Sequence, residues 1–566
     1  MHPLVVIIIL LIPVAYYIHL FLDAYRKRKN DPHELPGPTL FPYIGRIHDL
    51  PIDYMWVKFR EWADIYGPIY RTEMLGTKFV IVSDEKIIEE LLVKRAKYNS
   101  DRPGVKSLFD SKSTYGSMEY LPLMGHNQYW ARGRKLTHSY LTQGTNAQYY
   151  GFMDYEVKRW MYRLLTEPET FQYTLEDMAA KIMCHLVWDD HVHSTKLIPS
   201  AWGLLTQMSP AGPITNILTP LWDLPLFLNP WKRAEHKRHD TQQAFWLERL
   251  EQVRRETAEG LTRPSFTRQY LEMADKAPLS GDHEASSCLG MLAIVGVFTI
   301  GGPLNYFLLS MLYHPAAQLR CQQEMLQVLG DRPPTLSDMP RLPFLRACIR
   351  ETMRWKPNVP TGVAHETERD DYYNGYFIAK GSRILPLDCA LLRNPKKYPD
   401  PDNFRPERWV EPGWPTYQEP LTQYPTIKGM TSFGWGQRQC LGMSLTQDEL
   451  FIACGNLLYY FDLKKAVGRD GKEINPDPEK SNSLLIIKPD KFEMRFEVRG
   501  EEKRRAIVER WETAEKEFEG RREEFRGRGR KEREELREKV ERVVEEKART
   551  VKVTEVEVVD VVDVVV

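Results

Sequence analysis

The feature that most constrains the fold is a run of almost uninterrupted apolar residues from position 290 to 313. Read as a helix, the run is apolar on every side, and a helix without a polar face is buried among other elements. A second helical pattern covers residues 244–259. Strand patterns are short: residues 78–82, and a hairpin at Asn374-Gly375, a dipeptide that accepts the positive φ of a type I′ turn. We therefore expect a mainly α fold with a small β region.

Composition narrows the class of protein and its partners. The chain has 566 residues, of which 42% are hydrophobic, enough to bury a large core. Basic and acidic residues balance at 78 each, so there is no charge excess that would attract nucleic acid. The seven cysteines show no paired Cys-x-x-Cys spacing, which favours a reducing compartment over a disulfide framework.

The N-terminus carries the membrane signal. Residues 4–22 are mostly apolar, close to the roughly 20 residues that cross a bilayer as a helix. A basic cluster at residues 26–29 follows this run, whereas a cleavable signal peptide has its basic residues first. We expect a single uncleaved transmembrane helix with the body of the protein on the cytosolic side. A cleaved secretory signal is the alternative.

The rest of the chain divides by composition. We expect an anchor with its basic stop at residues 1–29, a proline-stiffened spacer at 30–50, and one continuous domain at 51–499. Residues 500–566 differ, because residues 501–549 are almost all Glu, Lys and Arg and the end is rich in valine. With few apolar residues, this tail is interpreted as a solvated helix of unknown role. A dispensable extension, or an error in the gene model, is the alternative.

A short loop, FGWGQRQCLG at residues 433–442, has the pattern of a metal-binding site. The thiolate of Cys440 is a soft ligand suited to iron. Gly436 and Gly442 allow tight turns and free backbone N–H groups near the sulfur. Arg438 offers a planar fork of donors that suits a carboxylate. The alternative is that Cys440 is an ordinary small, buried apolar residue without a metal.

Four segments together resemble the cytochrome P450 superfamily. The loop Phe433-x-x-Gly436-x-Arg438-x-Cys440-x-Gly442 resembles its haem-binding signature. Residues 351–354 look like its Glu-x-x-Arg helix, residues 404–409 like its arginine-bearing segment, and residues 130–134 like its Trp-x-x-x-Arg helix. The resemblance covers roughly residues 1–499. It implies a cytochrome P450 fold and haem b, iron protoporphyrin IX, with Cys440 as the metal ligand.

The same resemblance implies roles for the surrounding residues. A buried triad around the haem is implied for Glu351, Arg354 and Arg408, against the alternative of an ordinary surface pair three residues apart on one helix. The residues implied to contact the haem, in its binding loop or at its propionates, are Phe433, Gly436, Gly442, Trp130, Arg134, His365 and Arg438. For Trp130 and Arg134 the alternative is a packed ring beside a solvated cation, and for His365 a histidine that is simply hydrogen bonded.

The apolar helix departs from the family pattern. By resemblance, Gly296 and Thr299 are catalytic residues at the oxygen site, but Phe298 stands where the family has an acid. Pro303 removes the N–H that would bond to the carbonyl of Thr299, so a kink with a free carbonyl is expected there. The alternative is that Gly296, Gly301 and Gly302 only ease helix packing.

The resemblance implies a haem-dependent monooxygenase that hydroxylates or otherwise oxidises a small, largely apolar molecule with O₂. Electrons would come from NADPH through a separate membrane-bound reductase, with the enzyme held in the lipid of the endoplasmic reticulum by one span. The apolar helix ending in Tyr313-His314-Pro315 is similar to fungal enzymes of secondary metabolism, including those acting on phenolic polyketides. A pocket is expected between residues 102–130, 296–303, 358–362 and 481–486. Two alternatives stay open: a reductase-independent isomerase, dehydratase or peroxygenase of this fold, which the missing acid favours, and a haem-binding protein without catalysis.

Overall fold

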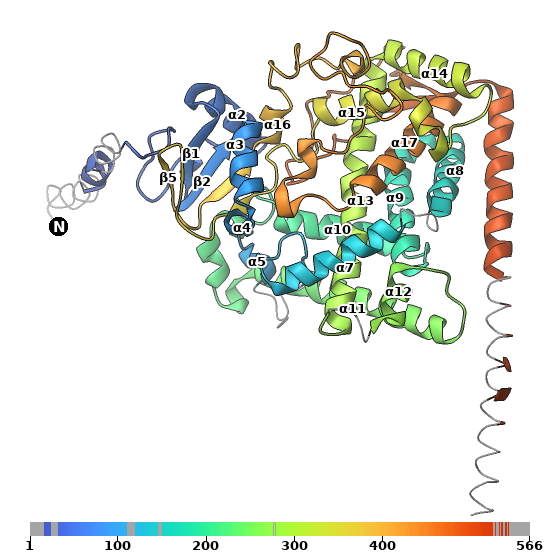
Figure 1. Ribbon diagram of the computed structural model, residues 1–566, viewed down its shortest axis with the longest axis horizontal. Coiled ribbons are helices and arrows are strands. Elements are labelled where there is room, and N and C mark those ends of the chain that lie inside the picture. The colour runs from blue at the N-terminus through green and yellow to red at the C-terminus, as the bar shows by residue number, and fades with distance from the viewer. Residues whose placement is uncertain are drawn as a thin grey trace, which may run out of the picture.

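The computed structural model describes residues 16–23, 32–109, 119–144, 150–274, 277, 279–523 and scattered residues between 527 and 542. The molecule is mainly helical, with its largest sheet at one end (Figure 1), which confirms the expected class. The α-helices are α2 (Met55–Tyr66), α3 (Glu85–Ile88), α4 (Ala96–Asn99), α5 (Lys106–Phe109), α7 (Gln128–Gly144), α8 (Tyr150–Thr166), α9 (Phe171–Trp188), α10 (Ser194–Met208), α11 (Pro230–Ala258), α12 (Phe266–Glu272), α13 (Asp282–Tyr313), α14 (Pro315–Leu329), α15 (Pro343–Trp355), α16 (Asp388–Leu391) and α17 (Met443–Tyr460).

Short helical turns connect these helices. The 3₁₀ turns are η1 (Ile47–Asp49), η3 (Pro168–Thr170), η4 (Ile214–Asn216), η5 (Thr219–Asp223), η6 (Leu226–Leu228), η8 (Leu336–Arg341), η9 (Pro406–Trp409), η10 (Thr431–Phe433) and η11 (Gly436–Arg438), and η2 (Glu89–Lys94) is a π-helix.

Among the described residues, the β structure consists of one four-stranded sheet, one hairpin and one two-stranded sheet whose strands are distant in the chain. The sheet has the order β1-β2-β6-β3, in which β2 and β6 are parallel and the other neighbours antiparallel. Asn374 and Gly375, with φ of 47° and 84°, form the expected turn of the β4–β5 hairpin. The strands are β1 (Ile69–Met74), β2 (Thr77–Val82), β3 (His365–Glu366), β4 (Asp371–Tyr373), β5 (Tyr376–Ile378), β6 (Arg383–Pro386), β7 (Phe461–Lys465) and β8 (Met494–Val498).

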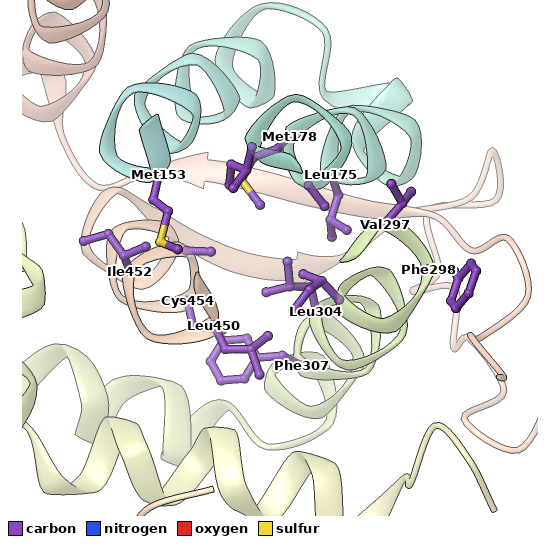
Figure 2. Packing of buried hydrophobic residues seen from close by; sticks show 14 of the residues in the cluster. Met153, Leu175, Met178, Val297, Phe298, Leu304, Phe307, Leu450, Ile452 and Cys454 are labelled. Atoms are coloured by element: carbon purple, nitrogen blue, oxygen red, sulfur yellow. The ribbon is translucent and has the colours of Figure 1, made fainter. Parts of the chain in front are cut away.

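Helix α13 is the centre of the helical part. It begins at Asp282, earlier than the apolar run alone indicated, and it contacts α9, α10, α11, α15 and α17. Figure 2 shows Leu304 and Phe307 of α13 close to Leu175 of α9 and Leu450 of α17, whereas Phe298 points away from this group. A helix that is apolar all round needs such an enclosure, because each side must be removed from water.

Helix α13 is also the one helix among the described residues that is long and apolar enough to cross a membrane. Because 78% of its apolar window is buried inside the protein, α13 is a core helix. The anchor expected at residues 4–22 lies largely outside the described residues. Its last part, residues 16–23, is helical, and Tyr17 donates a hydrogen bond to the carbonyl of Pro42 at 3.1 Å.

The proline-rich segment expected as a spacer contacts the sheet. Leu35 is 3% exposed and packs with Ile69 and Val80, and the N–H of Arg71 donates to the carbonyl of Pro36 at 2.9 Å. A side chain at Gly37, whose φ is 157°, would collide with the Arg71 carbonyl. Residues 35–37 are therefore part of the packed body.

Residues 501–523 form a helix after β8 that lies along one side of the molecule (Figure 1). Ile507, Trp511, Ala514 and Phe518 are buried, the last three in a cluster with Tyr155 of α8. These residues recur every three or four positions, so they share one face of the helix. The expectation of a segment solvated on all sides is wrong for residues 507–518, because few apolar residues suffice when they line a single face.

Candidate active site

Cys440 lies in a tight loop between η11 and α17. Its N–H donates to the carbonyl of Phe433 at 2.7 Å, and the N–H of Gly442 donates to the Cys440 sulfur at 3.3 Å. Gly436 has a φ of 54°, and a Cβ there would lie 2.1 Å from the carbonyl oxygen of Leu92 in η2. Glycine is therefore required at this position by the approach of η2, and the loop is held rigidly beneath the sulfur.

The surroundings of the thiol favour its neutral form. Desolvation raises the pKa of Cys440, while the N–H of Gly442 and the charge of Arg134 oppose this shift. Binding to a metal ion would keep the sulfur deprotonated.

A cavity of about 300 Å³ opens above Cys440. Its wall includes residues from three of the four segments expected to line it, namely 102–130, 296–303 and 358–362. Of the fourth segment, residues 481–486, only Leu485 and Ile486 line the cavity. Met183 of α9 and Met208 of α10 also line the cavity, and neither was expected from the sequence. The wall is mostly apolar: Leu121, Leu123, Met208, Met291, Leu292, Val295, Phe298, Ile300, Val359, Leu485 and Ile486.

Three guanidinium groups gather at one end of the cavity, where Arg102, Arg134, Arg438 and the imidazole of His365 all line it. Arg438 donates to the carbonyls of Ser100 and Met124, but its buried Nη1 has no hydrogen-bond partner among the described residues. Burial and the charge of Arg134 lower the pKa of Arg438 to about 10, against the opposing charge of Asp101. Burial, Arg438 and Arg134 also lower the pKa of Arg102. Among the described residues, the three guanidinium groups donate to backbone carbonyls and form no ion pair with a carboxylate.

Trp130 and His365 complete this end of the cavity. The Trp130 ring is 6% exposed and lies 4.2 Å from the guanidinium carbon of Arg438 and 5.8 Å from that of Arg134. His365 is hydrogen bonded through Nδ1 to the carbonyl of Asn99 at 2.8 Å. Burial and the charge of Arg102 lower the pKa of His365.

These residues fit a haem group. The Nη1 of Arg438 and the arginine cluster, which forms no ion pair among the described residues, suit carboxylates, which the propionates of haem would supply. The sulfur of Cys440 would supply a thiolate ligand for iron, and Phe433, 8% exposed, contributes an apolar surface to the same cavity.

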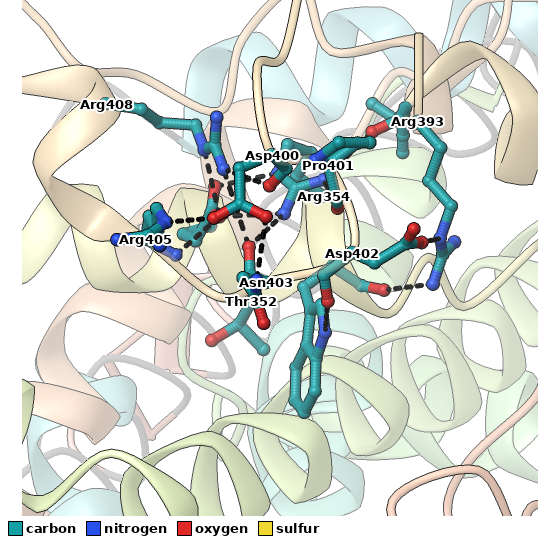
Figure 3. Close-up of polar contacts among 12 residues, drawn as sticks. Thr352, Arg354, Arg393, Asp400, Pro401, Asp402, Asn403, Arg405 and Arg408 are labelled. Atoms are coloured by element: carbon teal, nitrogen blue, oxygen red, sulfur yellow. Dashed lines mark hydrogen bonds and ion pairs between the residues drawn. The ribbon is translucent and has the colours of Figure 1, made fainter. Parts of the chain in front are cut away.

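The Glu351 carboxylate is fully buried between two arginines. Arg354 donates to it at 2.8 and 2.9 Å, Arg408 at 3.0 Å, and the Trp409 indole N–H at 2.9 Å. Figure 3 shows how Arg354 and Arg408 also reach the loop at residues 400–403, where Arg354 donates to the carbonyls of Pro401 and Asn403. With none of the three side chains exposed, the surface-pair alternative is wrong. Removing one partner would leave a buried charge unpaired.

The turn of α13 beside the cavity differs in part from expectation. A Cβ at Gly296 would lie 2.4 Å from the sulfur of Met183, so a side chain at this position would displace the Met183 side chain of α9. The Thr299 hydroxyl donates to the carbonyl of Val295 at 2.7 Å. The expectation that the Thr299 carbonyl is free is wrong, because the side-chain amide of Asn358 donates a hydrogen bond to it at 3.3 Å. Helix α13 continues through Pro303.

Several polar residues of the cavity were not expected from the sequence, Arg102 and Glu449 among them. Arg102 begins a segment expected to line the pocket, and in the structure it belongs to the arginine cluster. Glu449 of α17 is 1% exposed, its Oε1 has no hydrogen-bond partner among the described residues, and burial raises its pKa to about 8. The sequence does indicate that Glu449 is unusual, because this acidic residue directly precedes the apolar run 450–454.

Comparison with known proteins decides the family, because the cytochrome P450 family model matches residues 35–496. The chain belongs to the cytochrome P450 family. Cytochrome P450 monooxygenase fogE of Aspergillus ruber is 30% identical, over 84% of this chain and 89% of its own. Cytochrome P450 monooxygenase virE of Hypocrea virens is also 30% identical, over 86% and 89%. This cytochrome P450 is a monooxygenase by class, and the family implies a haem-thiolate iron centre.

Proposed function

We propose that this cytochrome P450 is a membrane-anchored monooxygenase that oxidises a small, neutral and largely apolar molecule. One observation carries the proposal: a single cavity joins Cys440, an arginine cluster that needs carboxylates, and a wall of aliphatic and aromatic side chains. A charged substrate would be desolvated against this wall without a partner, which costs several kcal/mol. An apolar one gains about 25 cal/mol per Å² of surface removed from water.

Haem bound here through a thiolate supplies oxygen activation, so that one atom of O₂ enters a substrate bond and the other leaves as water. The chain's own residues orient the substrate and handle protons. Thr299 brings a hydroxyl to the cavity, with its proton directed to Val295. The Phe298 side chain has no proton to donate at this turn, so water, Thr299 or the substrate must act as the proton donor. Gly296 remains a proposed member of the oxygen site, and it also allows α13 to pack closely against Met183.

We infer that electrons come from NADPH through a separate reductase. The described residues include an open depression of about 690 Å³ beside Cys440, reached from the side of α7. Arg134, Lys135, His138 and Lys428 line it with the loop residue Gln437, and no acidic residue takes part. A basic rim of this kind supports docking of an acidic electron-donor surface.

Membrane association in the endoplasmic reticulum, with the catalytic domain in the cytosol, is proposed from two features. The first is the apolar segment 4–22 with its basic stop. The second is a group of exposed apolar side chains on the turns between α10 and α11, with Phe227 76% and Leu228 56% exposed. Such a group is suited to contact with lipid. Deleting residues 1–29 is expected to weaken membrane sedimentation, and adding Phe227→Ser to abolish it.

The substrate is proposed to belong to fungal secondary metabolism, with a phenolic polyketide as one class. The fungal sources of the relatives support this proposal, as does the cavity wall, which offers aromatic and aliphatic contacts with few polar groups.

A second function is favoured by Phe298. An apolar ring at the turn that needs protons suits an isomerase, dehydratase or peroxygenase that works without reductase. Expression of the full chain in yeast with a NADPH-cytochrome P450 reductase, followed by mass spectrometry of a fed metabolite library, separates the two. We expect a product heavier by one oxygen that requires NADPH. Product formation without NADPH or reductase would favour the second function, and Cys440→Ala is the inactive control beside Cys389→Ala, a buried cysteine outside the cavity.

A further inference from the structure

The turn of α13 at the cavity has a backbone acceptor without a backbone donor. In a regular helix the N–H of residue 303 would bond to the carbonyl of Thr299, but Pro303 has no N–H. A buried carbonyl left without a partner costs free energy. The amide nitrogen of Asn358 donates to this carbonyl at 3.3 Å and so takes the place of the missing backbone donor.

Asn358 reaches the helix because Gly302 has no side chain. A Cβ at Gly302 would lie 3.2 Å from the Asn358 Cβ and 2.8 Å from the carbonyl oxygen of Ile487. The carbonyl of Asn358 in turn accepts a hydrogen bond from the N–H of Ile487 at 2.8 Å. The segment at residue 358 is thereby held between α13 and the segment at residue 487.

The other half of the Asn358 amide is available to a ligand. Since the nitrogen faces the Thr299 carbonyl, the oxygen is the remaining polar atom, and among the described residues none donates to it. Asn358 is 8% exposed and lines the same cavity as Thr299 and Cys440. Around it the cavity wall from α13 is apolar except for Thr299.

We propose that Asn358 positions the oxygen-side turn of α13 and also recognises the substrate. Its amide nitrogen holds the Thr299 carbonyl, and its amide oxygen accepts a hydrogen bond from a hydroxyl group on an otherwise apolar substrate. The inference rests on the proposed function and names its substrate class: small apolar molecules that carry a hydroxyl donor. A polar group in an apolar wall discriminates strongly between ligands with and without a hydroxyl donor, because a ligand without the donor leaves the amide oxygen unpaired.

The positioning role is tested by a double-mutant cycle on the full-length holoenzyme. Asn358→Leu removes the donor, and Pro303→Ala restores the backbone N–H. We expect Asn358→Leu to lower the Tm by at least twice as much in the wild-type background as in the Pro303→Ala background, because the carbonyl is stranded only in the former. Equal losses in both backgrounds would overturn the positioning role. Should Asn358→Leu alone not fold, its rescue by Pro303→Ala supports the role, and failure of the rescue contradicts it.

The recognition role is tested by calorimetric binding of two probes, 2-naphthol and 2-methoxynaphthalene, which differ in the hydroxyl donor. We expect 2-naphthol to bind about fivefold more tightly to the wild-type and Pro303→Ala proteins, the effect of one neutral hydrogen bond. In Pro303→Ala/Asn358→Leu, in which the carbonyl is satisfied, the ratio is expected to fall to about one by the same reasoning. An unchanged ratio, or no saturable binding of 2-naphthol, would overturn this role. Because neither test uses turnover, failure here is distinct from failure of the NADPH-dependent reaction.

Discussion

The ring of Phe518 stacks on the ring of Tyr155, with 4.3 Å between centroids and 12° between planes. Phe518 lies beyond residue 496, where the match to the family ends, whereas Tyr155 belongs to α8 within it. Arg159 strengthens the contact, since its guanidinium carbon lies 5.0 Å from both the Tyr155 and Trp511 rings. Residues 507–518 therefore complete the side of the molecule at α8.

Removing the helix of residues 501–523 is expected to destabilise the enzyme. Truncation after Gly500 would expose the face of α8 that Trp511 and Phe518 cover. Trp511→Ala in the full chain is expected to cost about 3 kcal/mol, as for other buried aromatic residues. Thermal unfolding of the holoenzyme measures both, and truncation after residue 523 is the control expected to keep the wild-type Tm. A wild-type Tm after truncation at Gly500 would show that the packing contributes nothing.

Arg438→Met is expected to weaken haem retention. The buried Nη1 of Arg438 has no partner in the part of the chain that the structure describes, so a haem carboxylate is its natural acceptor. A hydrogen bond to a charged group contributes about 1.5–3 kcal/mol. That corresponds to haem loss faster by roughly tenfold or more, measured by transfer to a haem-scavenging protein. Arg346→Met is the matched control, since Arg346 is equally buried at 7% exposure but donates to the carbonyls of Pro425 and Leu421, outside the cavity. Equal haem retention in both variants would contradict the role of Arg438.

The sequence predicted the elements whose pattern is local. The all-apolar run predicted the buried helix α13, and the Asn374-Gly375 dipeptide predicted a hairpin turn. The loop motif predicted that Cys440 lies in a tight turn. Each depends on neighbours within one element, where periodicity or turn chemistry decides the outcome. The family assignment followed from four such segments in order.

What the sequence did not predict depends on contacts between distant segments. The carbonyl freed by Pro303 is satisfied by Asn358, which is 59 positions from Thr299 in the chain. The charged tail packs on α8 because Trp511, Ala514 and Phe518 lie on one face of their helix, and overall composition does not show how residues are distributed over the faces of a helix. Arg102 joins Arg134 and Arg438 only in three dimensions.

Glu449 is expected to make stability fall as pH rises. Burial raises its folded pKa to about 8, above the ordinary value of 4.5, so the folded state keeps a proton that the unfolded state releases. Stability from this group is therefore full below about pH 4.5 and is lost progressively as pH rises to about 8, by an amount on the order of a few kcal/mol. Glu449→Gln should flatten this slope in unfolding measured between pH 5 and 8, whereas Glu493→Gln, at an exposed position, should keep it. An unchanged slope in Glu449→Gln would show that Glu449 is charged in the folded enzyme.

The coupling of electrons to product is expected to depend on the turn at Phe298 and Thr299. Phe298 lines the cavity without a proton to give, and the hydroxyl of Thr299 is the nearest protic side chain along α13. A protic group at this turn orders water and directs protons to bound oxygen, and without it reducing equivalents are lost as hydrogen peroxide.

Thr299→Ala is therefore expected to raise the ratio of peroxide to product severalfold with a good substrate, and Phe298→Asp to lower that ratio with a poor one. Thr352→Ala is the matched control for the first variant, because the Thr352 hydroxyl makes the same kind of bond, to the carbonyl of Cys348 at 2.9 Å, but lies outside the cavity. NADPH consumption, peroxide and product are measured together in the reductase-supported reaction. If Thr299→Ala leaves both the ratio and the rate unchanged, this turn of α13 does not deliver protons, and a reaction without reductase becomes the better account of why Phe298 replaces an acid.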